Sequence, residues 1–198
     1  MKLKAVIVII LIIGLASFAE AQYSAQLFSA ETVMKGNSRA FANFGIYDHV
    51  RTIVGGYRYG IGGYTDAGFR LGYVDFDHGD DGFVLGGDMR YQLMEVRIQD
   101  PLDLSVGGLF ETVLGVGSSN FSLGGFAIGS RAIALTKTKS LWPYGRLIMR
   151  WDHVPHHNEL NIGLNTGANF EIGATTKVCA EFQFDDQFGF IIGLIFGL

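Results

Sequence analysis

All five histidines of the chain fall in segments that are also rich in aspartate. The histidines are His49, His78, His153, His156 and His157, and the neighbouring aspartates are Asp48, Asp77, Asp80, Asp81, Asp152, Asp185 and Asp186. Imidazole and carboxylate groups together can bind a transition metal, and carboxylates alone can bind calcium. Their spacing matches no ligand motif, and Asp is an ordinary turn residue. We therefore expect a solvated rim and predict no cofactor, with His153, His156 and His157 as weak candidate metal ligands.

The C-terminal segment 187–198 indicates which elements position these residues. One parity carries bulky apolar side chains, namely Phe188, Phe190, Ile192, Leu194, Phe196 and Leu198. The other parity contains Gln187, Gly189, Gly193 and Gly197. A strand with one apolar face and one nearly bare face fits a transmembrane β-barrel, with lipid outside and a crowded lumen inside.

The amino terminus has the pattern of a secretory signal peptide. Lys2 and Lys4 precede an apolar run over 5–16, and a small-x-small cleavage pattern follows at 19–21. A transmembrane helix needs about 18 or more apolar residues, so this run is too short to be an anchor. We expect residues 1–21 to be removed, which leaves strands as the way for the mature chain to span a membrane.

The mature chain, 22–198, is predicted to form one all-β domain. Its composition is typical of strands and turns, because the 198 residues of the full chain include 28 Gly, 16 Phe and 8 Tyr but only 3 Pro. Turn signals delimit about ten strands of roughly nine to fourteen residues, with eight or twelve also open, in a closed antiparallel up-and-down barrel. The predicted strands are 38–47, 50–61, 67–76, 83–97, 103–116, 121–135, 141–152, 158–172, 175–185 and 187–198.

Strand 121–135 is the weak case, because its apolar parity changes near Gly124 and Gly125, which suggests a bulge or a misplaced boundary. An even strand number places both ends of the barrel on one side, which should be the periplasm. The connections near 63–66, 98–102, 136–140 and 173–175 would then face inward, and the histidine-containing connections outward.

Charged residues collect on the parity that faces the lumen. They are Arg39, Arg58, Arg70, Asp88, Arg90, Glu111, Arg146, Arg150, Glu159, Glu171, Lys177 and Glu181. The charges nearly balance, and an unpaired buried charge costs several kcal/mol, so we expect opposite charges on neighbouring strands to pair. Either these pairs fill the interior as a structural network, or they line a narrow water-filled pore.

Composition excludes several other functions. The net charge of −4 is mild and spread along the chain, which gives no basis for nucleic-acid binding. One cysteine, Cys179, cannot form an internal disulfide and is expected to be buried.

Three features make the mature chain resemble the small bacterial outer-membrane β-barrel proteins of the porin type. They are the cleavable leader, the Gly-aromatic hairpins such as Gly55-Gly56-Tyr57-Arg58-Tyr59-Gly60, and the alternating final strand. The resemblance implies outer-membrane lipid and the barrel assembly machinery as partners, with the last strand as insertion signal. In that family the last strand usually ends in an aromatic residue, whereas this chain ends in Leu198, with Phe196 two positions earlier.

The sequence thus predicts an integral outer-membrane barrel, either a narrow porin-like channel for small solutes or a structural surface barrel with a charge-filled lumen. We do not expect an enzyme, because no Ser-His pairing is evident and the outer loops are short. A rim-active hydrolase using His153, His156 or His157 is one alternative. A secreted soluble barrel with Phe69, Leu71, Leu160 and Ile162 around an internal cavity is the other.

Overall fold

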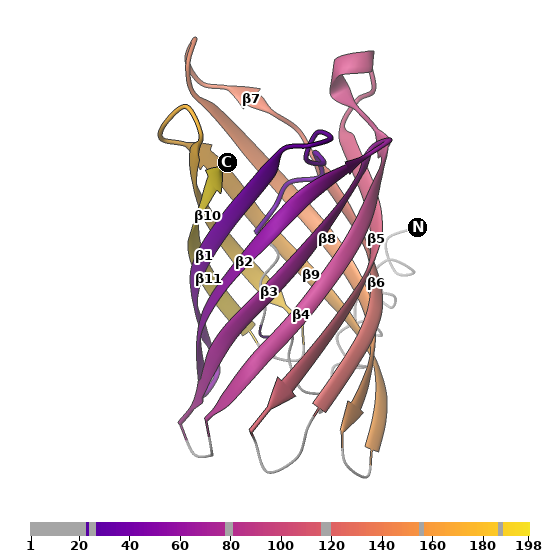
Figure 1. Cartoon of the computed structure of the whole chain (residues 1–198), viewed down its shortest axis with the longest axis vertical. Coiled ribbons are helices and arrows are strands. Elements are labelled where there is room, and N and C mark those ends of the chain that lie inside the picture. The colour runs from indigo at the N-terminus through magenta and orange to yellow at the C-terminus, as the bar shows by residue number, and fades with distance from the viewer. Residues whose placement is uncertain (1–22, 24–26, 78–80, 116–119, 155–156, 186–187) are drawn as a thin grey trace, which may run out of the picture.

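The computed structural model describes residue 23 and residues 27–77, 81–115, 120–154, 157–185 and 188–198. The long strands are β1 (Ser38–Tyr47), β2 (Val50–Gly62), β3 (Thr65–Phe76), β4 (Gly82–Met94), β5 (Asp103–Leu114), β6 (Asn120–Ser130), β8 (Ser140–Val154), β9 (His157–Glu171), β10 (Thr176–Phe184) and β11 (Phe188–Gly197) (Figure 1). A short 3₁₀ turn, η1 (Val96–Ile98), and a two-residue strand, β7 (Ile133–Ala134), lie in connections.

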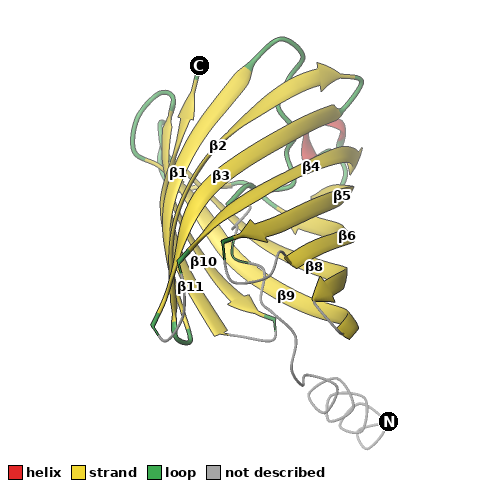
Figure 2. Cartoon of the chain, turned by 60° about the horizontal axis from the view of Figure 1, so that its bottom comes forward, coloured by secondary structure: helices red, strands yellow, loops and turns green. Residues whose placement is uncertain are grey.

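The long strands form a closed antiparallel barrel. Each pairs with its sequence neighbour, β1 pairs with β11, and β6 pairs with β8, which completes the cylinder (Figure 2). Strand β7 pairs only with Leu141 and Ser140 of β8 and takes no part in closure. The predicted ten-stranded up-and-down barrel is therefore confirmed. Closure pairs every edge, so the backbone polar groups of the strands are satisfied within the sheet.

Most predicted strand boundaries agree with the structure to within a few residues, and the larger differences lie at one end of the barrel. Strand β4 ends at Met94 after a register irregularity, and 96–98 is a 3₁₀ turn. Strand β6 ends at Ser130, so its extension to 135 was wrong. The predicted connection near 63–66 lies at the same end of the barrel but is shorter, because β3 begins at Thr65 and Asp66 pairs within it against Gly60 and Arg90.

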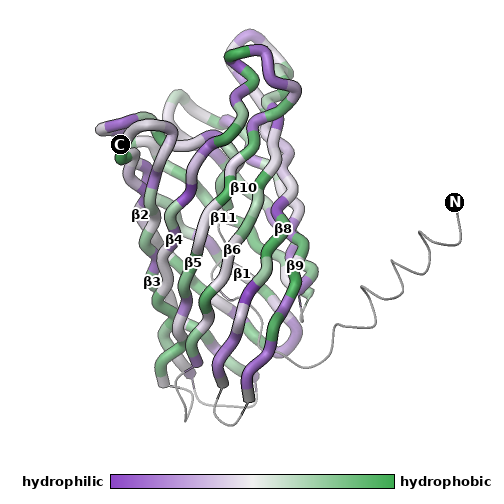
Figure 3. The backbone as a smooth tube through the Cα atoms, turned by 90° about the vertical axis from the view of Figure 1, so that its right-hand side faces the viewer, coloured by the Kyte–Doolittle hydropathy of each residue, from purple (hydrophilic) through white to green (hydrophobic). Residues whose placement is uncertain are grey.

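Large apolar side chains face outward along the strands. Leu71, Leu147, Leu160 and Ile162 are each more than half exposed, at 53%, 56%, 65% and 63%. The alternation of hydrophobic and hydrophilic residues is visible along the tube in Figure 3. The soluble alternative required Phe69, Leu71, Leu160 and Ile162 to line a cavity, and it is wrong because they lie on the outside. A belt of this kind needs hydrocarbon around it.

The predicted irregularity in strand β6 does not exist. Its register with β5 and β8 runs unbroken past Gly124 and Gly125. Phe126 and Ile128 instead point inward, where they pack in a buried cluster with Ala30. The parity appeared to change because the lumen is apolar at this height, not because the backbone shifts.

Both ends of the barrel wall lie at the same mouth, where the Leu198 amide donates to the Ser38 carbonyl at 3.0 Å. This mouth, which also has η1 and β7, is called the inner mouth below (Figure 1). The opposite mouth, formed by the connections that follow β1, β3, β5, β8 and β10, is called the outer mouth after the predicted orientation. Among the described residues no helix is long and apolar enough to cross a membrane. The predicted leader, 1–21, lies outside the described residues.

Candidate functional site in the barrel lumen

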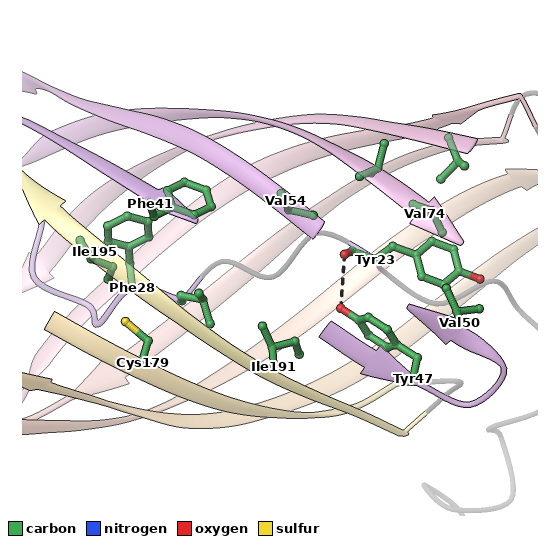
Figure 4. Packing of buried hydrophobic residues seen from close by; sticks show 13 residues of the cluster. Tyr23, Phe28, Phe41, Tyr47, Val50, Val54, Val74, Cys179, Ile191 and Ile195 are labelled. Carbon is green, nitrogen blue, oxygen red and sulfur yellow. Dashed lines mark hydrogen bonds between the residues drawn. The ribbon is translucent and has the colours of Figure 1, made fainter. Parts of the chain in front are cut away.

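A stretch of chain that precedes β1 lies inside the barrel. Tyr23 and residues 27–33 form this luminal segment, and all of them except half-buried Glu31 are buried. At the outer mouth, the Tyr23 ring makes edge contacts with Tyr47 and Phe76, with centroids 5.7 and 5.6 Å apart. The Tyr47 hydroxyl donates to the Tyr23 carbonyl at 3.3 Å (Figure 4). The segment then runs through the lumen towards the inner mouth.

Side chains of the wall satisfy the backbone amides of the luminal segment. Four backbone amides donate hydrogen bonds to wall side chains: Tyr23 to Glu111 Oε1 (3.0 Å), Ala30 to Ser130 Oγ (2.9 Å), Thr32 to Gln92 Oε1 (3.0 Å) and Val33 to Asp66 Oδ2 (2.7 Å). Buried backbone groups need such partners, and a segment outside the sheet must find them on side chains. The wall is therefore built to receive this segment.

The carbonyls of the segment are also held. Arg90 donates to the carbonyls of Ser29 at 2.5 Å and Glu31 at 2.8 Å, and the Ser105 hydroxyl donates to the Ala30 carbonyl. Bonds from a charged guanidinium are about twice as strong as neutral ones. Residues 29–33 are consequently fixed on both edges of their backbone, near the inner mouth.

Two apolar side chains anchor the middle of the segment. The Phe28 ring packs edge-on against Phe41 with centroids 5.3 Å apart, and the guanidinium carbon of Arg58 lies 4.9 Å from its centroid. Leu27 faces Gly193 of β11, where an added Cβ would lie 2.5 Å from the Leu27 Cδ1 atom. The bare face of the last strand thus leaves room for the luminal segment.

Replacing this glycine tests the packing. We expect Gly193→Val to lower the free energy of unfolding by about 1–3 kcal/mol, because the new side chain overlaps Leu27 and also the Ala42 carbonyl and the Asn43 Cβ atom of β1. Gly145→Val is the matched control, since a Cβ at Gly145 meets nothing within 4 Å. Urea unfolding in lipid vesicles measures both, and combining Gly193→Val with Leu27→Ala should recover part of the loss. Equal losses for the two glycine variants would contradict the contact.

The first charge cluster lies on the wall formed by β2, β3 and β4. Arg58 contacts Asp66 and Asp88, both at 2.5 Å, Arg70 contacts Asp88 at 2.7 Å, and Arg90 contacts Asp66 at 2.8 Å. All five side chains are at most 3% exposed. Two carboxylates therefore neutralise most of the charge of three guanidinium groups. The other hydrogen bonds that Arg90 donates go to the Ser29 and Glu31 carbonyls of the luminal segment.

The second cluster surrounds Glu181 of β10. Its Oε1 atom accepts from Arg146 at 3.0 Å, Asn165 at 3.0 Å and Gln183 at 2.8 Å, and its Oε2 atom accepts from the Tyr144 hydroxyl at 2.6 Å. These donors come from β8, β9 and β10, opposite the first cluster in the barrel order. A fully buried carboxylate with this many donors is well compensated.

A third cluster lies at the outer mouth. Arg150 contacts Asp152 at 2.6 Å and Asp185 at 2.7 Å, and Asn161 donates to Asp152 at 2.6 Å. Asp152 and Asp185 were expected on a solvated rim, but their side chains are only 4% exposed. They turn inward because Arg150 is buried just below them.

The other predicted lumen residues lie at the two mouths or against the luminal segment. Arg39 lies 3.8 Å from Glu31 of the segment, and the Lys177 ammonium lies 3.5 Å from the Trp142 ring centroid. Glu171 accepts from the Ser140 amide at 3.2 Å, buried Glu111 binds Tyr23, and half-buried Glu159 pairs in register with Asp152. The structure thus places every predicted lumen residue on the inward parity.

Sequence reasoning missed Asp66 and the luminal segment. Asp66 is fully buried and binds Arg58, Arg90 and Val33, yet it follows a Gly-Gly pair that has the composition of a turn. Asp66 lies an even number of positions before Arg70 and Val74 of the same strand, so the alternation of the strand could have assigned it to the inward face.

Of the rim histidines, His78 and His156 lie outside the described residues. His153 stacks on Trp151, and its Nδ1 atom lies 2.6 Å from Asn158 Oδ1. His157 begins β9. Among the described residues no group of three metal-ligating side chains is close enough to hold an ion. The predicted metal candidates receive no further support.

No family model matches the chain, and no curated protein matches it.

Several solved structures are similar to the chain in fold. A bacterial polysaccharide outer membrane secretin is 9% identical with a TM-score of 0.51, covering 83% of this chain and 66% of that one. The KdgM porin is 9% identical with a TM-score of 0.44, covering 80% and 98%. An outer membrane channel from Pseudomonas putida F1 is 10% identical with a TM-score of 0.45, covering 92% and 100%.

At this identity the likeness concerns the fold alone. The closed antiparallel cylinder and its apolar exterior define the class of the protein. The chain is a small β-barrel of the transmembrane type, with Tyr23 and residues 27–33 inside its lumen.

Proposed function

We propose that the protein is an integral outer-membrane channel that is closed by its own luminal segment. The observation that carries this proposal is the burial of Tyr23 and residues 27–33 between the two charged walls. Outer-membrane lipid would surround the exposed belt, and the barrel assembly machinery would insert the strands. Small solutes would be the cargo of the open form. We propose no catalytic role and no cofactor.

The charge clusters support a lining rather than a seal. Apart from Arg39, which contacts Glu31 of the luminal segment, the ion pairs of the first two clusters join neighbouring or next-neighbouring strands of one wall, within β2 to β4 or from β8 to β10. Pairs of this kind neutralise a wall and leave the space between the walls to whatever occupies it. The luminal segment lies in that space, so its removal would leave a pore lined by these neutralised charges and by the inward-facing apolar side chains of the two buried clusters.

A buried polar side chain of the wall beside the middle of the luminal segment is left unsatisfied by the described part of the chain. Leu27 lies near Asn43 of β1, and both amide atoms of this buried side chain lack a hydrogen-bond partner among the described residues. Each such atom costs about 1–3 kcal/mol, and water would satisfy it if the segment left. This cost favours a displaceable plug.

Planar-bilayer recording tests the proposal. The full-length protein should be silent, and deletion of residues 23–33 should produce discrete ion-permeable steps. The milder variant Gln92→Ala with Ser130→Ala, which removes acceptors of Thr32 and Ala30, should open intermittently. Gln183→Ala is the control, because this polar side chain binds Glu181 on the other wall.

Folding of each variant is checked by heat-modifiable gel mobility, since closed barrels resist detergent unfolding until heated. Silence of both opened variants in a folded barrel would contradict the channel and leave a structural surface protein. Equal conductance of the full-length protein and the deletion would contradict closure by the segment.

A further inference from the structure

The two ends of the luminal segment lie near opposite mouths of the barrel. Tyr23 contacts Tyr47 and Phe76, which end strands β1 and β3 at the outer mouth. Ten residues later, Val33 binds Asp66, which lies beside Gly60 near the inner mouth. An extended stretch of ten residues spans at most about 33–36 Å, and the hydrocarbon core is about 30 Å thick. The segment is long enough to cross the membrane inside the cylinder.

The chain reverses direction at the inner mouth. The Gly36 amide donates to the Gly60 carbonyl at 3.0 Å, the Gly60 amide donates to the Asn37 carbonyl at 3.1 Å, and the Asn37 amide donates to the Met34 carbonyl at 3.0 Å. Gly36 has a φ of 82°, which suits this turn. Strand β1 then returns towards the outer mouth. Because the barrel is closed, the segment cannot leave the lumen sideways.

The outer mouth suits a positively charged chain end. Its described carboxylates are Asp48, Asp75, Asp77, Asp81, Asp152, Glu159 and Asp185. They outnumber the nearby arginines Arg51 and Arg150, which already contact Asp77 and the pair Asp152 and Asp185. A free α-amino group has a pKa of about 7.7–8.0 and is mostly protonated at neutral pH. Its charge is complementary to that of this rim.

We propose that the chain before Tyr23 leaves the lumen through the outer mouth and that this mouth lies at the cell surface, while the barrel wall begins and ends at the periplasmic mouth. This inference rests on the proposed orientation of the barrel but not on its conductance.

Cysteine labelling of whole cells tests the topology. A short extension with one cysteine is inserted between Ala21 and Gln22, in a Cys179→Ala background. The companion variant is Thr138→Cys in the exposed connection at the inner mouth. A membrane-impermeant maleimide should label the extension fully in intact cells, and Thr138→Cys only after permeabilisation. The unaltered chain is the blank, because Cys179 is fully buried.

Labelling of both sites only after permeabilisation would overturn the threading. The reversed pattern, with the cysteine at 138 labelled in intact cells and the extension labelled only after permeabilisation, would overturn the surface location and the proposed orientation while leaving the plug intact. An epitope tag in place of the cysteine extension, detected with antibody on intact cells, gives a second readout if the cysteine variant fails to assemble. Absence of the tag from the surface of cells with a folded barrel would equally overturn the proposal.

Discussion

Asp66→Asn should lower the free energy of unfolding by about 3–5 kcal/mol, the cost of removing one partner from a buried ion pair. Asp66 is fully buried and accepts from Arg58 at 2.5 Å, from Arg90 at 2.8 Å and from the Val33 amide at 2.7 Å. The asparagine keeps the shape of the side chain but removes its negative charge. It also turns an NH₂ group towards donors, so two guanidinium groups lose a shared carboxylate.

Asp75→Asn is the matched control for this prediction, because it makes the same chemical change in the same strand. Asp75 is half-buried on the outward parity near the outer mouth, and its replacement should stay within about 0.5 kcal/mol. Urea titration in lipid vesicles, followed by tryptophan fluorescence, measures both variants. A loss at Asp66 no larger than that at Asp75 would mean that the β2–β4 cluster does not stabilise the barrel. Since Asp66 also holds Val33, the weakened variant should open intermittently in planar bilayers.

The arrangement of the wall could be predicted from the sequence because the period of a strand is two. Once Leu160 and Ile162 are assigned to lipid, Asn161 and Asn165 must face the lumen, and the structure buries both. The same argument places Arg58, Arg70 and Arg90 inside. Their pairing with carboxylates on adjacent strands follows from the cost of an unpaired buried charge.

The luminal segment could not be found in the same way. Its partners are distant in sequence: Ala30 binds Ser130, which is 100 residues away, and Thr32 binds Gln92, which is 60 residues away. No local period reports contacts of this kind, and a segment held by wall side chains needs no alternation. The apolar inward patch of β6 was an indirect signal, since Phe126 and Ile128 pack in one buried cluster with Ala30 of the luminal segment and with Leu109, Tyr144 and Ile148 of the wall.

Leu71→Arg should destabilise the barrel in a lipid bilayer by about 2–4 kcal/mol, the range for a cation on the lipid face at the midplane. Leu71 lies near the middle of β3, 53% exposed, with Leu85 of β4 as its outward neighbour. Arginine at this position must either bring its charge into hydrocarbon or distort the bilayer to reach water. Ile61→Arg is the control, because Ile61 is 49% exposed but lies near the end of β2 at the inner mouth. A guanidinium there reaches the interface, so its cost should fall to about 0–1 kcal/mol.

The contrast between Leu71 and Ile61 depends on depth and not on exposure, which is nearly equal at the two positions. Unfolding titrations of both variants in vesicles therefore report where the bilayer lies along the barrel. In a water-surrounded barrel, both arginines would lie on a solvated surface and cost little. Equal costs at the two positions would consequently contradict a transmembrane belt. A cost confined to Leu71 places the bilayer around the middle of the strands, at the height where the luminal segment fills the interior.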